Sequence, residues 1–386
     1  MERAYSYFII PFNRENETAK TVSIPADWTR VDKCRSCELH SYITERMFGK
    51  NHAVCEIYDR ERKETFCDNK TGRELTLLFT RIFLYKEGTS FAVFCLQYGG
   101  DFSVDDVIDT NSRLKYIRTI NPLEFTAEPH AQSFSGNISE DLQENYLAKR
   151  LRTLMKEVCG DISISTGKAL LCVYSVCPAE QMNRQTLFYL ATGNSRKFAY
   201  SEESAFSTYI QAENVIHGLC REGIAVITHE GGGSFVMDKS SAYSLVGNYR
   251  ENYLLMYIII LCQYYGFRDY NKKALVLYRQ NRRRPSVREL DSLRNNADIF
   301  YLENVHSDVS QITHQNRIYE ELLKIYNISA LISDFKEDIS ICNRLLEQEK
   351  LNSKMIVIVL STAVAAIAGI FEVLANFTSV FDFIFG

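Results

Sequence analysis

Five residues near the C-terminus are spaced so that they could line a path for cations. When the segment 355–381 is placed on a helix at 100° per residue, one face carries a carboxylate among small or polar side chains: Ser361, Ala365, Ala368, Glu372 and Asn376. An ionisable residue inside an apolar segment is energetically expensive and is by default a functional candidate. Several copies around a common axis would form an acidic ring that concentrates cations. The same face could instead be a packing seam without conduction, and a buried helix that does not span is the third alternative.

A second group that could bind a ligand is the basic cluster Arg282, Arg283 and Arg284, which precedes Pro285. Adjacent guanidinium groups can bind anionic lipid headgroups or a phosphate-bearing ligand. A solvated loop is the alternative for the same residues.

Metal binding and catalysis have little support in the sequence. Cys34 and Cys37 have the spacing of one zinc-ligand pair and His40 follows them, but the later cysteines are single, so we expect no metal site. The glycines of 229–233 precede a strand-like run, which favours a hairpin turn over a phosphate-binding loop. His217 is expected in a turn or at the surface, and the sequence shows no nucleophile, protease or kinase motif. The chain is therefore predicted not to be an enzyme and to need no cofactor.

The C-terminal segment is long enough to cross a lipid bilayer. It has no charged residue from Met355 to Phe371, and at about 1.5 Å per residue the segment 355–381 would cover roughly 40 Å, against about 30 Å of hydrocarbon. The nearest basic residues all precede it: Lys336, Arg344, Lys350 and Lys354. No Lys or Arg follows, so the positive-inside rule places the N-terminal part in the cytoplasm. We expect one transmembrane helix in the cell (inner) membrane.

A long helix is expected to lead into this segment. Between Val305 and Tyr326, apolar or aromatic residues step by four and three, which is a heptad pattern. A break is expected at 327–329, and a second helix then begins at Ile328 with no Pro or Gly before Gly369, so stalk and span would form one rod. Such a rod could transmit movement from a soluble domain to the membrane. A static coiled coil that only oligomerises is the alternative.

The N-terminal half has a different pattern. Runs rich in β-branched and aromatic residues predict strands at 5–12, 81–85, 91–98, 169–176 and 223–228, with a hairpin turn at 86–88. A helix is expected from Ser139 to Gly160. The apolar run 253–265 is too short to span comfortably and is expected to form a buried helix.

These patterns predict an α+β fold with four parts. They are a mixed α/β cytoplasmic sensing or regulatory domain over 1–245, a helical region over 246–326, a stalk helix over 327–354 and a transmembrane helix over 355–381. With 386 residues, 46% hydrophobic and 24% charged, the chain can bury a full core. A net charge of -4 argues against duplex nucleic acid as a partner. Eleven scattered cysteines without a leader peptide indicate reduced thiols in a cytoplasmic domain.

The order of these parts, an α/β domain followed by helices and a stalk that continues into a C-terminal membrane helix, resembles the CorA family of divalent-cation channels. It is also similar to the CorA-like membrane effectors of prokaryotic antiviral systems, which respond to nucleotide signals. The resemblance covers roughly residues 249–381 and concerns architecture. Family members usually have two membrane helices joined after a Gly-Met-Asn signature, and this chain has neither that tripeptide near its span nor room for a second helix. The resemblance therefore implies no magnesium selectivity here.

The preferred hypothesis is a homo-oligomeric channel or membrane-perturbing effector of antiviral defence, gated by a cytoplasmic domain that binds a nucleotide or another small ligand. Membrane lipid, further copies of the chain and cations in the pore are the expected partners. The alternatives are a CorA-like divalent-cation transporter, a membrane-tethered binding module without conduction and, less favoured, an anchored enzyme.

Overall fold

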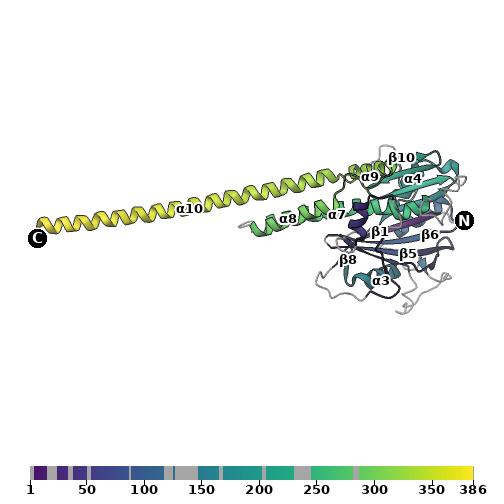
Figure 1. The fold of residues 1–386 in the computed structure, drawn as a ribbon, viewed down its shortest axis with the longest axis horizontal. Coiled ribbons are helices and arrows are strands. Elements are labelled where there is room, and N and C mark those ends of the chain that lie inside the picture. Colours follow the sequence, from purple (N-terminus) through teal and green to yellow (C-terminus); the bar gives the residue numbers. More distant parts are fainter. Residues whose placement is uncertain are drawn as a thin grey trace. The chain divides into compact units, whose positions relative to one another are not determined.

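The computed structural model describes residues 4–14, 24–33, 38–49, 54–86, 88–116, 125–126, 147–164, 168–201, 206–229, 245–280 and 287–385. The chain has the expected α+β composition, with a sheet in its N-terminal part and helices in its C-terminal part (Figure 1). It divides into two compact units. The first comprises Met1–Phe267 and Ile299–Ala330, and the second comprises Arg268–Asp298 and Leu331–Gly386.

A mixed sheet organises the first unit, and its strands within the described ranges are ordered β10-β11-β12-β9-β1-β6-β5-β3-β2. In addition, β4 pairs with β5 and β7, and β8 pairs with β1. Strands β9 and β12 are parallel, and the other described pairs are antiparallel. The bounds are β1 Ala4–Arg14, β2 Thr29–Arg30, β3 Cys55–Arg60, β4 Glu64–Asp68, β5 Arg73–Tyr85, β6 Ser90–Tyr98, β7 Phe125–Thr126, β8 Ile162–Ile164, β9 Leu170–Cys177, β10 Ser207–Ala212, β11 Val215–Cys220 and β12 Gly223–His229.

The strands expected from the sequence pattern are confirmed. β1 covers the run at 5–12, and β5 and β6 form the predicted hairpin, with Gly88 in its turn at φ 83°. β9 and β12 cover the runs at 169–176 and 223–228. β1 lies between β6 and β9, and its residues from Ala4 to Phe12 are all buried. A strand that is buried on both faces needs a nearly continuous apolar run, which this strand has.

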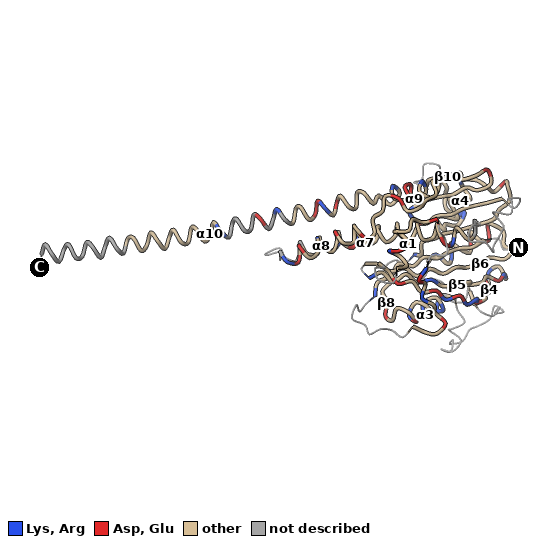
Figure 2. Tube along the Cα trace, viewed as in Figure 1, with Lys and Arg blue, Asp and Glu red and all other residues tan. Residues whose placement is uncertain are grey.

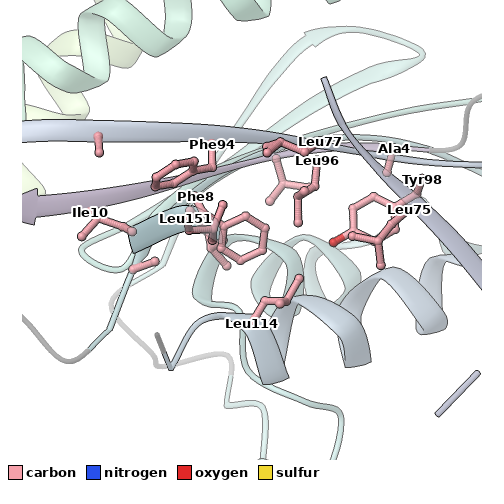
Figure 3. Close-up of a cluster of buried hydrophobic side chains, with 14 of the residues drawn as sticks. Ala4, Phe8, Ile10, Leu75, Leu77, Phe94, Leu96, Tyr98, Leu114 and Leu151 are labelled. Carbon is pink, nitrogen blue, oxygen red and sulfur yellow. The ribbon is translucent and has the colours of Figure 1, made fainter. Parts of the chain in front are cut away.

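One face of the sheet is covered by helices α2 Val104–Leu114, α3 Leu147–Cys159 and α4 Arg184–Thr192. Figure 3 shows Phe8 and Ile10 of β1 in a cluster with Leu114 of α2 and Leu151 of α3. Helix α3 ends before Gly160, as expected, whereas the predicted start at Ser139 lies outside the described residues. Short elements complete this part of the chain: α1 Ser41–Phe48, η3 Ala179–Gln181 and α6 Leu245–Asn248.

The opposite face is covered by a π-helix, η4 Tyr249–Tyr253, and by the first turns of the helix α7 Leu254–Gln280 that continues from it. The rings of Tyr7 in β1 and Tyr249 lie 6.3 Å apart, which places η4 directly on the sheet. Residues from Leu254 to Cys262 are at most 4% exposed, so the expected buried helix is confirmed. Helix α9 Thr313–Ile325 also packs on this unit, against β10 and β11.

The heptad pattern that begins at Val305 does not form one helix. Helix α8 Val287–Asn304 ends before it, and α9 starts only at Thr313. The intervening backbone pairs with the segment before α1: His40 N–H donates to Val309 O at 3.1 Å, and Gln311 N–H donates to Glu38 O at 2.9 Å. Because these backbone groups are satisfied by a distant segment, the helical spacing of the side chains is not realised there.

In the second unit, three helical segments pack together. The Tyr270 hydroxyl of α7 donates to Asn296 O of α8 at 3.2 Å, and its ring lies 5.9 Å from that of Phe335. Phe335 belongs to helix α10 Ile328–Phe385, which continues without interruption through Gly369. The break expected at 327–329 is confirmed, because Asn327 separates α9 from α10 with a φ of 53°.

Candidate functional site

The feature most unlike a folded soluble domain is the surface of helix α10 after Lys354. Figure 2 shows Lys, Arg, Asp and Glu along the first part of this helix and none along the described stretch that follows Lys354. Every residue from Lys354 to Ile370 is exposed. The large apolar side chains in this stretch are 54–65% exposed: Met355, Ile356, Val357, Ile358, Val359, Leu360, Val364, Ile367 and Ile370.

These side chains surround the helix on all sides. Six of them are consecutive, from Met355 to Leu360, and successive residues on an α-helix are rotated by 100°. Burying such a side chain stabilises by roughly 1.5–3 kcal/mol relative to leaving it in water, so this surface represents a large unfavourable free energy in an aqueous solvent. A helix that is apolar all round is typical of a protein core or of a membrane span.

The two hydroxyl groups of this stretch are satisfied within the helix. Ser361 and Thr362 both donate to Ile358 O, each at 2.8 Å. A hydroxyl bonded to a preceding carbonyl needs no water or protein partner. The described stretch therefore presents no unsatisfied side-chain hydroxyl to an apolar surrounding.

The structure places three of the predicted pore residues on this surface. Ser361, Ala365 and Ala368 are exposed and follow each other by four and three positions on a continuous α-helix, so they share one face. Glu372 and Asn376 belong to α10, but their side chains lie outside the described residues. The basic cluster Arg282, Arg283 and Arg284 and the glycine run 231–233 also lie outside them.

The expectation for His217 was wrong. His217 lies on β11, between β10 and β12, and is 2% exposed. Its Nε2–H donates to Gln211 Oε1 at 2.8 Å, and the Gln211 amide donates in turn to His314 Nε2 at 3.2 Å. Burial, assisted by His314, lowers the pKa of His217 to about 3, so the imidazole is neutral near pH 7. The sequence gives no local signal for this, because the cover comes from α9 and η4.

A second buried polar group was also missed by the sequence interpretation. On β5, Arg81 is 1% exposed, and it forms a bidentate pair with Asp59 at 2.7 and 2.8 Å. Glu251 of η4 lies 3.5 Å from the same guanidinium. Burial opposes the charge of Arg81, but the hydrogen bond and the charge of Asp59 raise its pKa above the ordinary value. In the sequence, Glu251 stands just before the apolar run 253–265, and nothing local indicates that it meets Arg81.

These buried groups connect helices to the sheet. His217 has Gln211, Tyr209 and Tyr253 as neighbours, and His314 adds to burial in lowering its pKa. Among the described residues, no group of three or more His, Cys, Asp or Glu side chains could hold a metal ion. Cys34 and Cys37 are outside those residues, and His40 Nε2 lies 3.1 Å from the carboxylate of Asp308.

Within the part of the chain that the structure describes, no helix is both long enough and apolar enough to cross a membrane. Comparisons with protein-family models, with curated proteins and with solved structures returned no match. The exposed apolar surface of α10 is the feature that the function of this chain must explain.

Proposed function

We propose that this chain is a membrane protein whose helix α10 enters the lipid bilayer at about Met355, and that several copies assemble through this helix. The observation that carries the proposal is the apolar surface from Met355 to Ile370, which is exposed all round an uninterrupted helix. Lipid can cover every side of such a helix at once, whereas packing on a single protein partner would cover one side.

The sequence beyond Ile370 extends the same character. Helix α10 continues to Phe385, and Glu372 is the one charged residue between Met355 and Phe381. At about 1.5 Å per residue this length exceeds a hydrocarbon core of about 30 Å. The basic residues that precede it, ending with Lys354, place the sheet-containing unit on the cytoplasmic side of the cell membrane.

In an assembly of several copies, the carboxylate of Glu372 could attract cations. The small residues Ser361, Ala365 and Ala368 let helices approach closely, and Glu372 follows them at the next position of the same helical face. Copies arranged around an axis then form an acidic ring for cations. In this proposal the protein is a channel or membrane-perturbing effector, and the α+β unit binds a nucleotide or another small ligand that gates it. The order of these parts resembles that of the CorA-like antiviral effectors.

The membrane assignment is tested by adding charge to the exposed surface. Replacing Leu360 and Val364 with lysine (Leu360→Lys, Val364→Lys) places two charges on one side of α10, and by insertion scales two central lysines cost up to about 5–7 kcal/mol. The wild-type chain is expected to float with lipid vesicles in a density gradient at high salt and to resist alkaline extraction, and the double variant is expected to lose both properties.

The matched control adds two lysines to the first part of the same helix, at the exposed positions Ser333 and Ser340 (Ser333→Lys, Ser340→Lys). This variant is expected to remain with the vesicles. If the wild-type chain stays in the aqueous fraction, or if Leu360→Lys/Val364→Lys floats as well as the control, the membrane assignment is wrong.

Conduction is tested separately in proteoliposomes. Glu372→Gln removes the charge but keeps the size of the side chain, so cation flux is expected to fall while vesicle flotation is retained. Equal flux through the wild-type and Glu372→Gln proteins would refute the role of Glu372. A wild-type chain that floats but conducts no ions is instead the membrane-tethered binding module, and exchanging its span for an unrelated apolar helix would then preserve activity.

A further inference from the structure

The junction between α9 and α10 has an unusual backbone. Asn327 has a φ of 53°, and among the described residues no other non-glycine residue has a positive φ. Few L-residues adopt this left-handed conformation readily, and asparagine is one of them. On either side, Tyr326 and Ile328 are 1% and 2% exposed, so the turn is packed inside the first unit.

The side chain of Tyr326 connects this junction to two other elements. Its hydroxyl donates to Arg221 O at 2.7 Å, in the turn between β11 and β12, and lies 2.8 Å from the hydroxyl of Tyr257 in α7. Because the Tyr326 proton is directed at Arg221, Tyr257 is the donor of the second bond. The ring of Tyr326 also packs edge-on against Tyr264, at 5.0 Å.

The β11–β12 turn also contacts Lys115 and strand β9. Lys115, which follows α2 and is 1% exposed, places its ammonium 3.8 Å from the carboxylate of Glu222 and donates to Thr192 O at the end of α4. The backbone N–H of Leu171 in β9 donates to Glu222 O at 3.2 Å. Lys115 therefore connects α2 and α4 to the turn, and Tyr326 connects the turn to the start of α10.

We infer that Tyr326 is the coupling residue of this protein: its hydroxyl passes movements of the β11–β12 turn to α10 by holding the backbone rotation at Asn327. Helix α10 has no further break before Phe385, so a change of φ and ψ at Asn327 is carried along the helix instead of being absorbed by a linker. The inference deepens the proposed function, on which it rests only for the statement that α10 ends in a membrane.

The test is a coupling experiment on the full-length chain in detergent, read by backbone hydrogen exchange of residues 328–342. Lys115→Met removes the contact of the ammonium with Glu222 in the turn. When Tyr326 is present, this change is expected to raise the exchange about tenfold, since one hydrogen-bonded contact is worth roughly that factor. In a Tyr326→Phe background the exchange is already raised, and Lys115→Met is expected to add nothing. The control is Tyr257→Phe, which keeps the bond from Tyr326 to Arg221, so Lys115→Met should still act in that background.

The inference is overturned if Lys115→Met acts equally with and without the Tyr326 hydroxyl. It is also overturned if Tyr326→Phe raises exchange in β11 and β12 as much as in α10, because that result means general destabilisation. The measurement needs no membrane, so its failure is distinguishable from failure of the flotation and flux experiments. If the coupling and the membrane function are both correct, Tyr326→Phe is expected to alter the ligand dependence of cation flux in proteoliposomes without abolishing membrane insertion.

Discussion

Acidification is predicted to destabilise the protein through His217. The folded state holds this imidazole neutral with a pKa of about 3, against an ordinary value of 6.5, and the unfolded chain regains the ordinary value. A histidine whose pKa is lowered on folding contributes stability that is complete above the unfolded pKa and is lost as the pH falls toward the folded pKa. The window for His217 is therefore pH 6.5 down to 3.

The magnitude follows from the pKa difference. Each unit of pH below 6.5 costs about 1.4 kcal/mol until the folded pKa is reached, so the expected loss at pH 5 is about 2 kcal/mol. Burial lowers the pKa of His306 to about 4 and also lowers that of His314, so both add a loss in the same direction. The contribution of His217 is isolated by comparing the wild-type chain with His217→Gln, whose amide can still donate to Gln211.

Urea unfolding at pH 8 and pH 5 gives the required free energies. The single tryptophan, Trp28, is 6% exposed and donates to Glu157 at 2.9 Å, so its fluorescence reports unfolding of the sheet unit. The loss of unfolding free energy between the two pH values is expected to be about 2 kcal/mol smaller in His217→Gln than in the wild type. Equal losses in the wild-type and His217→Gln chains would refute the assignment of a neutral, buried His217.

Two further predictions concern packing and charge in the same unit. A Cβ on Gly266 of α7 would lie 2.1 Å from the ring of Phe300. Gly266→Ala is therefore expected to lower the free energy of unfolding by about 1–3 kcal/mol, although alanine has the better helix propensity. Adding Phe300→Leu should restore part of this loss. Asp59→Asn removes the charge paired with the buried Arg81 and leaves Glu251 at 3.5 Å. The free energy of unfolding is expected to fall by about 3–5 kcal/mol. A fall below about 1 kcal/mol in urea unfolding would show that the pair is not buried in solution.

The local elements of this protein could be predicted because they depend on neighbours a few residues apart. β1, the β5–β6 hairpin and the buried start of α7 follow from apolar periodicity and from the glycine turn at 88. The continuity of α10 follows from the absence of proline between Ile328 and Phe385. The face shared by Ser361, Ala365 and Ala368 follows from the same helix.

Contacts between distant segments could be decided only by the tertiary structure. The sequence 305–326 has a helical spacing, yet its first part pairs with residues 38–40, because those backbone groups meet only after the chain has folded. The sequence around His217 does not differ from that of an exposed strand. The packing of η4 and α9 on β11 buries its imidazole and thereby lowers its pKa. Tyr326 meets Arg221 across 105 positions of sequence. Local patterns determine which backbone form a segment adopts, whereas burial, pKa and coupling depend on which segments the sheet order brings together.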